Sequence, residues 1–253
     1  MTGRVDAYLV ANAKYHDTDF ARLELLKLLA EDTDVRVRVA EDFSDTAAIG
    51  AADFLVTYTC DVRPAPEQEE ALRAFVERGG RWVALHATNA LLDFTPQGIS
   101  CPRTCDTFME TLGSRFISHP PIQPYRVTVS NPAHPLVAGI EAFEASDELY
   151  LCEYSPGVVP LLETRFTGSF PFRGGYVEHD FPEDTPRLVA YTHRVGAGEV
   201  FYLTLGHCCG KYDMQPLRDE TAVVRGSWEL PVFYELLRRA IAWAKEPPAP
   251  EKR

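Results

Sequence analysis

The sequence has 253 residues, of which 45% are hydrophobic and 25% are charged, so it carries enough apolar material for the core of one large α/β domain. Its 25 basic and 37 acidic residues give a formal net charge of -12. Such a surface repels the phosphates of nucleic acids and the headgroups of anionic lipids, so we expect neither nucleic acid nor a membrane as a partner.

The first half of the sequence alternates apolar strands with helices of regular apolar spacing. Strands are predicted at four apolar runs, residues 4–11, 34–40, 53–59 and 81–85. Two helices are predicted between them, over residues 20–31 and 67–78. Strands that are joined through helices by short turns favour a doubly wound, mostly parallel sheet.

The second half is less regular. We predict a lid-like loop at 91–105 and an ordered loop, rich in Gly, Pro and aromatic residues, at 167–186. The shorter elements predicted around them are a helix at 106–112, strands at 125–130 and 158–163, and a hairpin of 187–195 with 199–205. A closing helix is predicted at 230–245. We expect one domain over residues 1–246 and a disordered tail over 247–253.

The sequence predicts neither a signal segment nor a disulfide framework. The residues from Met1 to Ala7 lead straight into the first strand without an apolar signal core. The six cysteines form no CxxC pair, which favours reduced thiols. We therefore expect a cytoplasmic protein.

Polar residues gather where the expected strands end. In open α/β sheets, ligands bind beyond the carboxyl ends of the strands. The residues that four strands deliver there are Asn12, Lys14, Tyr15, His16 and Asp17; Thr59, Cys60 and Asp61; His86, Thr88 and Asn89; and His207, Cys208 and Cys209. Histidine titrates near neutral pH and its neutral form ligates metal ions. We therefore predict that His16, His86 and His207 converge in one working site.

Each of these candidates also has a purely structural explanation. His16 precedes a helix and could mark its start, and His86 follows five apolar residues and could be a hydrogen-bonded core residue. Glu148, in the block DELY at the start of a possible strand, is either a general base or ligand or a surface carboxylate beside Asp147. The adjacent Cys208-Cys209 pair is weak evidence for zinc ligands, because zinc sites prefer spaced cysteines.

The remaining histidines have turn or surface signatures. His119 and His134 each precede proline, and turn-building is the preferred role for His134. His179 and His193 are predicted at the surface or in a hairpin. The phosphate-binding motifs GxGxxG and GxxxxGK[ST] and the GxSxG elbow do not occur in the sequence.

Several blocks resemble the trehalose-utilisation (ThuA-like) family. They read GGRWVALHATNA, LGSRFISHPP, NPAHPLVAGIEAFEASDELY and YTHRVGAGEVFYLTLGH, and a final helix ends in IAWA. The resemblance runs from His16 to Ala244. It implies a fold similar to the class I glutamine amidotransferases, a flavodoxin-like three-layer sandwich.

The resemblance also implies a changed use of the amidotransferase cleft. The amidotransferase nucleophile, a cysteine, stands after the strand that here reads RWVAL, and this sequence has His86 there. The amidotransferase histidine follows a late strand, where this sequence has His207, so glutamine amidotransferase activity is not expected. The family's GHP block reads SHP at His119-Pro120, and the insertion-like stretch 208–228 leaves the substrate open.

The family's association with trehalose-type and 3-keto sugars implies an enzyme that acts on a small polyol or keto sugar. The expected catalytic residues are His86, His207, His16 and Glu148. The expected substrate-binding residues are Cys60, Asp61, Thr88, Asn89, His119 and Tyr150. His86 and His207 would act as acid and base, or they would hold a divalent metal such as zinc together with His16. The chemistry is either an isomerase or lyase step next to a carbonyl or a metal-assisted hydrolysis.

Two alternatives remain at this stage. The chain could be a regulatory module that binds a metabolite without turning it over, or Cys60, Cys208 or Cys209 could act as a reactive thiol. The aromatic stretch 166–181 either covers the cleft or packs in a homo-oligomer.

Overall fold

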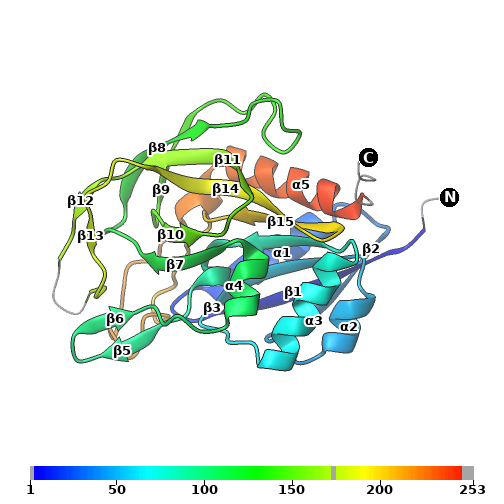
Figure 1. Cartoon of the computed structure of the whole chain (residues 1–253), viewed down its shortest axis with the longest axis horizontal. Helices are drawn as coiled ribbons and strands as arrows, with labels where there is room; N and C mark the ends of the chain where they lie inside the picture. The colour runs from blue at the N-terminus through cyan, green and yellow to red at the C-terminus, as the bar shows by residue number, and fades with distance from the viewer. Residues whose placement is uncertain (1–2, 172–174, 247–253) are drawn as a thin grey trace.

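The computed structural model describes residues 3–171 and 175–246, and the predicted tail at 247–253 lies outside these residues. One sheet of nine strands dominates the fold, in the order β2-β1-β3-β4-β15-β14-β11-β8-β9 (Figure 1). The strands on the parallel side are β2 (Val35–Ala40), β1 (Val5–Ala13), β3 (Phe54–Cys60), β4 (Arg81–Leu85) and β15 (Gly198–Leu203). The strands on the other side are β14 (Pro186–Val195), β11 (Val158–Arg165), β8 (Gln123–Val129) and β9 (Phe143–Asp147).

Parallel pairing holds only on one side of the sheet. β2, β1, β3, β4 and β15 run parallel to one another, whereas β14 pairs antiparallel with β15, and β11, β8 and β9 continue the sheet with antiparallel pairs. The mixed α/β fold is as expected, but the prediction of a mostly parallel sheet describes only the parallel side. The physical reason is the connection: the hairpin around Gly196 is too short to return the chain for a parallel strand.

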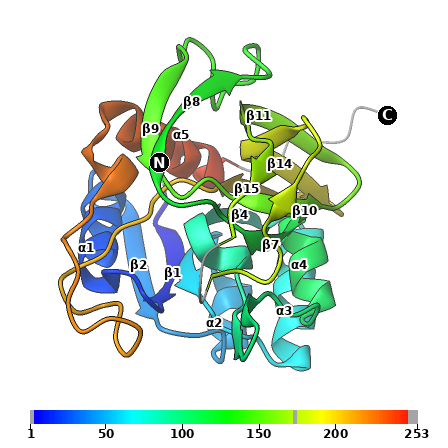
Figure 2. The same ribbon diagram turned by 90° about the vertical axis from the view of Figure 1, so that its left-hand side faces the viewer.

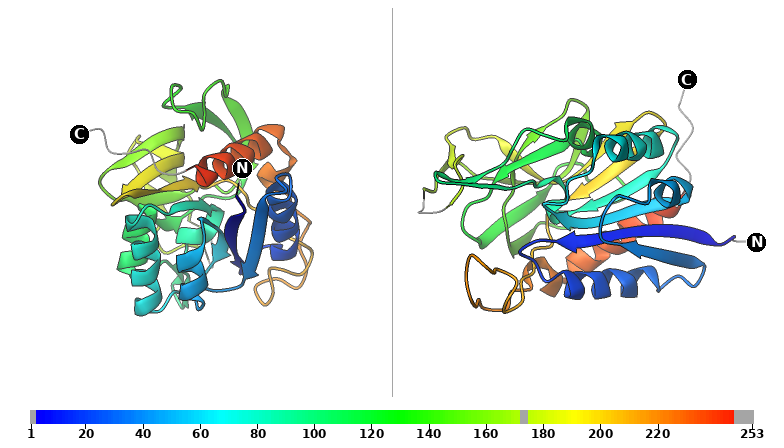
Figure 3. Two further views of the ribbon diagram at one scale, coloured as in Figure 1. Left: turned by 90° about the vertical axis from the view of Figure 1, so that its right-hand side faces the viewer. Right: turned by 90° about the horizontal axis from the view of Figure 1, so that it is seen from below.

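Helices cover both faces of the parallel half. α1 (Thr18–Leu29) and α5 (Pro231–Lys245) pack on one face, and α2 (Thr46–Ala51), α3 (Pro66–Glu77) and α4 (Asp106–Leu112) pack on the other (Figure 3). β1 serves both cores because its side chains alternate: Leu9 points to the first core and Tyr8 to the second. No α-helix within the described ranges is both long and apolar enough to span a bilayer.

Short elements lie where loops were predicted. The expected lid-like loop contains the hairpin of β5 (Asp93–Thr95) and β6 (Gly98–Ser100), and the aromatic-rich loop contains β12 (Gly168–Ser169) and β13 (Asp180–Phe181). A separate two-stranded sheet pairs β7 (Ser114–Ser118) with β10 (Leu151–Tyr154). Figure 2 shows β8 and β9 on the opposite side of the molecule from α2 and α3. The strands β5, β6, β12 and β13 have only two or three residues each, which is too few to show an alternation of apolar and polar residues in the sequence.

Candidate functional site

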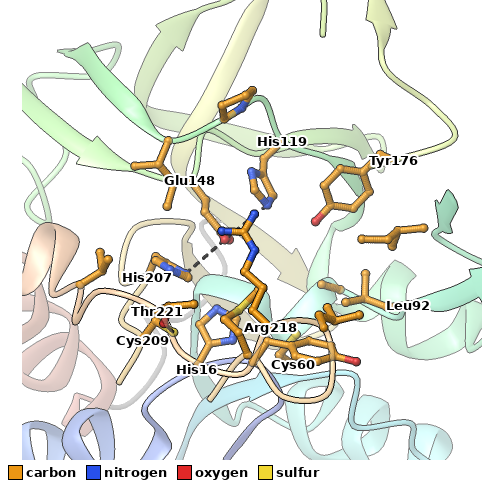
Figure 4. A pocket seen from close by; sticks show the side chains of 18 of the residues that line it. His16, Cys60, Leu92, His119, Glu148, Tyr176, His207, Cys209, Arg218 and Thr221 are labelled. Atoms are coloured by element: carbon orange, nitrogen blue, oxygen red, sulfur yellow. Dashed lines mark hydrogen bonds and ion pairs between the residues drawn. The ribbon is translucent and has the colours of Figure 1, made fainter. Parts of the chain in front are cut away.

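A pocket of about 870 Å³ lies beyond the carboxyl ends of the parallel strands (Figure 4). Its lining includes His16, which follows β1, Cys60, which ends β3, and His207, which follows β15. Glu148, from the link between β9 and β10, lies on the same pocket. His86 begins the short 3-10 helix η1 (His86–Asn89) directly after β4 and is fully buried below the lining. The structure therefore brings His16, His86 and His207 together at the ends of these strands.

Sharp turns end the strands at this edge. Tyr15, Asp61 and His86 adopt left-handed backbone conformations with φ of 68°, 56° and 49°, and Gly206 has φ of 126°. A side chain with a β carbon pays roughly 1–2 kcal/mol for this conformation. Such backbone strain concentrates at functional sites, where the surrounding structure holds it. The turns keep the following side chains close to the strand ends.

His16 and His86 face each other through the same ring atom. The Nδ1–H of His16 donates to the carbonyl of Lys14 at 2.7 Å, and the Nδ1–H of His86 donates to the carbonyl of Thr204 at 2.8 Å. Because a carbonyl only accepts, each ring has its proton on Nδ1 and a lone pair on Nε2 in the neutral form. The two Nε2 atoms lie 2.9 Å apart. Two lone pairs at this distance need a proton or a cation between them.

Glu148 is the carboxylate at the centre of the histidines. Its Oε2 lies 3.4 Å from His86 Nε2, and its Oε1 lies 3.3 Å from His119 Nε2 and 3.2 Å from His207 Nδ1. Burial acts to raise the pKa of Glu148, but His119, His207 and His86 together hold it well below its ordinary value. Glu148 is therefore ionised, and it supplies negative charge to a cluster of buried histidines.

Burial and the charge of Glu148 shift the pKa values of the histidines in different directions. Burial opposes the charged form of His86, yet the hydrogen bond and charge of Glu148 raise its pKa above 6.5. Burial, then repulsion from His86 and His207, lowers the pKa of His16 well below 6.5. Burial also lowers the pKa of His207. When the site holds a proton rather than a metal, that proton resides on His86 and bridges to His16.

The donor atoms fit a divalent metal. One donor atom from each of His16, His86, His207 and Glu148 lies within 4.8 Å of all the others. Zinc with four donors at about 2.0–2.1 Å separates them by roughly 3.4 Å in a tetrahedron, close to the shorter spacings found here. Histidine ligands typically donate their second N–H to a carbonyl, as His16 and His86 do. His207 Nδ1 is buried and lies 3.2 Å from Glu148 Oε1, but it makes no well-aligned hydrogen bond among the described residues, so it is free to ligate a metal.

Asp147 clamps the two loops that carry Glu148 and His207. It is 1% exposed, and its carboxylate accepts four backbone N–H groups, from Glu148 (2.8 Å), His207 (3.1 Å), Gly206 (3.0 Å) and Ser227 (3.2 Å). These four hydrogen bonds fix the loop of Glu148 against the loop of His207. In the sequence, Asp147 stands out only as a neighbour of Glu148, because nothing there shows which loops meet.

The expected substrate-binding residues divide into two groups. Cys60, His119 and Tyr150 line the pocket, and the Tyr150 hydroxyl lies 3.3 Å from His86 Nε2. Asp61, Thr88 and Asn89 are not among the lining residues and instead hold the turns. Asp61 binds the side chain of Lys14 at 3.0 Å. The Thr88 hydroxyl donates to Leu85 O at 2.8 Å, and the Asn89 side chain donates to Ser114 Oγ at 2.6 Å.

Other sequence predictions have mixed outcomes. His134 lies in a turn, where its Nδ1 accepts from the N–H of Leu136 at 3.3 Å. Of the two places predicted for His193, the hairpin is the correct one: it lies in β14 opposite Val200 of β15, and it is not at the surface, because α4 covers β14. It is 8% exposed, and its Nδ1–H donates to Thr111 O. Burial raises the pKa of Cys60 well above its ordinary value and that of Cys208 to about 12, which argues against a reactive thiol at either residue.

The stretch 208–228 contributes side chains that the sequence analysis did not select. Met214, Leu217, Arg218 and Thr221 line the pocket. Figure 4 shows the Arg218 side chain extending into it. The stretch has no regular apolar spacing, so its position over the pocket was not visible in the sequence.

Comparisons with known proteins identify one matching family model and several similar solved structures. The family model ThuA, described as trehalose utilisation, matches residues 7–226. A ThuA-like protein from Bacteroides uniformis has a TM-score of 0.67 at 16% identity over 96% of this chain and 93% of its own. A ThuA-like protein from Parabacteroides merdae has a TM-score of 0.60 at 16% identity over 96% and 90%.

A more distant structure has the same fold. A protein from Thermoplasma acidophilum that is described as part of a GMP synthase has a TM-score of 0.53 at 7% identity, over 96% of both chains. No curated protein matches the sequence. At these identities the structural likeness establishes the fold alone.

Proposed function

Because the chain belongs to the ThuA family of trehalose utilisation, as its sequence blocks predicted, we propose that it is an enzyme that acts on a small polyol or keto sugar. Its working centre is the cluster of His16, His86, His207 and Glu148, which would hold a divalent metal such as zinc. One observation carries this proposal: two imidazoles with their protons locked on Nδ1 present their Nε2 lone pairs to each other at 2.9 Å.

The residues of the pocket have separate tasks in this proposal. A zinc ion bound at the centre would supply Lewis-acid polarisation of a sugar carbonyl or of a hydrolysable bond. His119 donates its Nδ1–H to Pro120 O at 2.8 Å, so its Nε2 faces the pocket and can take up or deliver a proton. Tyr150 orients the substrate through its hydroxyl, and apolar side chains such as Phe116 exclude water from the reacting groups.

Two reaction types use these groups equally well. Proton abstraction next to a carbonyl, in an isomerase or lyase, needs a base and a polarised carbonyl, and hydrolysis needs the same base to activate water. A glutamine amidotransferase is not proposed, since His86 occupies the place of the nucleophile. That substitution favours the second candidate, a module that binds a metabolite without turnover, and turnover of a keto sugar separates the two.

Metal content tests the proposal most directly. Purified, chelator-free wild type should contain stoichiometric zinc or another divalent ion by mass spectrometry, and His86→Ala and His207→Ala should lose it together with turnover of keto sugars. His134→Ala, which removes a turn histidine outside the cluster, should retain both. Full metal content and turnover in both cluster variants would refute the proposal. Circular dichroism of each variant shows that it has folded.

The broader expectations are proposals as well. We propose that residues 1–246 form one domain with a flavodoxin-like, class I glutamine amidotransferase-like layout, and that the protein works in the cytoplasm. The helices on both faces of the parallel strands support the layout. The six unpaired cysteines agree with a reducing compartment.

A further inference from the structure

The segment 208–225 folds on itself and closes one side of the pocket. Cys209 and Val224 pair through two backbone hydrogen bonds of 2.9 and 2.8 Å. Inside this pair, the N–H of Thr221 donates to Lys211 O at 2.9 Å. The segment therefore has a defined shape of its own, and its side chains reach the pocket from fixed positions.

Arg218 is the cation that this segment brings to the pocket. Its backbone N–H donates to Met214 O at 3.1 Å, and its side chain extends into the pocket (Figure 4). Neighbouring cations are matched by acids: Lys14 lies 3.0 Å from Asp61, Lys211 lies 3.1 Å from Glu220, and Arg225 lies 3.0 Å from Asp17. Within residues 3–171 and 175–246, the Arg218 guanidinium has no ion-pair partner.

The rest of the described lining gives Arg218 nothing to bind. Glu148 is the carboxylate of this lining, and three histidines already surround it. Much of the remaining wall is apolar or aromatic, from Leu92, Phe94, Ile99, Phe116, Ile122, Tyr176, Met214 and Leu217. Arg218 is exposed, so water solvates its charge, and an anion that enters the pocket meets a guanidinium without an acidic partner among the described residues. Arg218 thus gives the pocket a positive charge in a chain whose net charge is -12.

We propose that the substrate is a sugar acid, whose carboxylate binds Arg218 while its hydroxyl or carbonyl end reaches the histidine cluster. This inference rests on the proposed action on a carbohydrate and names the substrate class. A single guanidinium matches a carboxylate in charge and in the fork of its N–H groups. A phosphate dianion usually takes several donors from a glycine-rich loop, a helix N-terminus or further cations. Among the described lining residues, Arg218 has no second Lys or Arg beside it.

Matched pairs of sugars test this inference. Isothermal titration of the zinc-loaded protein should compare glucuronate with glucose, galacturonate with galactose, and gluconate with glucitol. Wild type should bind at least one acid about tenfold to a hundredfold more tightly than its neutral partner, the range expected of a charge-assisted hydrogen-bonded pair. Arg218→Gln should abolish that preference. Arg36→Gln removes the same charge from the edge strand β2, outside the pocket, and should keep it.

Three results would overturn the inference: no acid in the panel binds wild type better than its neutral partner, Arg218→Gln keeps the preference, or glucose 6-phosphate binds more tightly than every acid. Zinc content measured on the same samples separates this inference from the metal proposal. An acid preference that depends on Arg218 in protein without metal would uphold the inference and refute the metal centre. Stoichiometric zinc with no acid preference would do the reverse.

Discussion

Asp147→Asn tests the clamp that holds the candidate centre together. The change keeps the shape of the side chain but turns one oxygen into an NH2 group. Oδ1 accepts from Glu148 and His207, and Oδ2 accepts from Gly206 and Ser227. Whichever way the amide turns, its NH2 group faces two backbone N–H donors, so two hydrogen bonds are lost.

The magnitude follows from these four contacts. A hydrogen bond to a charged group contributes about 1.5–3 kcal/mol, so the loss of two lowers the free energy of unfolding by about 3–6 kcal/mol. Because Asp147 is 1% exposed, water cannot replace the lost partners. This is a large share of the roughly 5–15 kcal/mol that stabilises a typical protein. Urea unfolding followed by circular dichroism measures it, and zinc content should fall as Glu148 and His207 lose their positions.

Asp53→Asn is the matched control. Asp53 is exposed, and its Oδ2 accepts one backbone N–H, from Asp6 at 2.7 Å. The same chemical change there should cost less than about 1 kcal/mol, since water replaces the lost bond. If Asp147→Asn also unfolds within about 1 kcal/mol of wild type, Asp147 does not act as a clamp and the reasoning fails.

Two further predictions concern stability and thiol chemistry. The pKa of Glu24 is lowered below 4.5 by hydrogen bonds from Lys27 and Tyr234, so this stabilisation is present above pH 4.5 and is lost as the pH falls through the lowered pKa. Tyr234→Phe should cost about 1 kcal/mol at pH 7, and acid titration of stability should show the deficit shrinking, whereas a constant deficit would contradict this. Burial raises the pKa of Cys101 to about 12, so iodoacetamide at pH 8 should label it only in urea, as peptide mass spectrometry can verify.

The sequence predicts the parallel half of the fold well, because its strands are long apolar runs bounded by turns. The predicted runs at 53–59 and 81–85 correspond to β3 at Phe54–Cys60 and β4 at Arg81–Leu85. Their carboxyl ends meet at one edge, so the grouping of His16, His86 and His207 follows from local patterns and one topological rule.

The remaining parts of the site depend on contacts that no local pattern records. Asp147 ends β9 and Glu148 lies in the link beyond it, rather than at the start of a strand as predicted. His119 reaches the pocket because β7 pairs with β10, two short strands that the sequence analysis did not predict. Arg218 lies in a segment held by its own backbone bonds, whose packing over the pocket is a tertiary property.

The candidate ligands come from distant parts of the chain, since His16 follows the first strand and His207 follows the last strand of the sheet. Closing that loop costs an unfolded chain conformational entropy before these donors can meet, so the unfolded chain would bind the ion poorly. Metal binding would therefore stabilise the native state alone, by about 2.7 kcal/mol at a hundredfold excess over Kd. Scarcity of the ion in the cell would then remove the activity of the protein. It would also shorten the lifetime of the protein, because proteases degrade the transiently opened form.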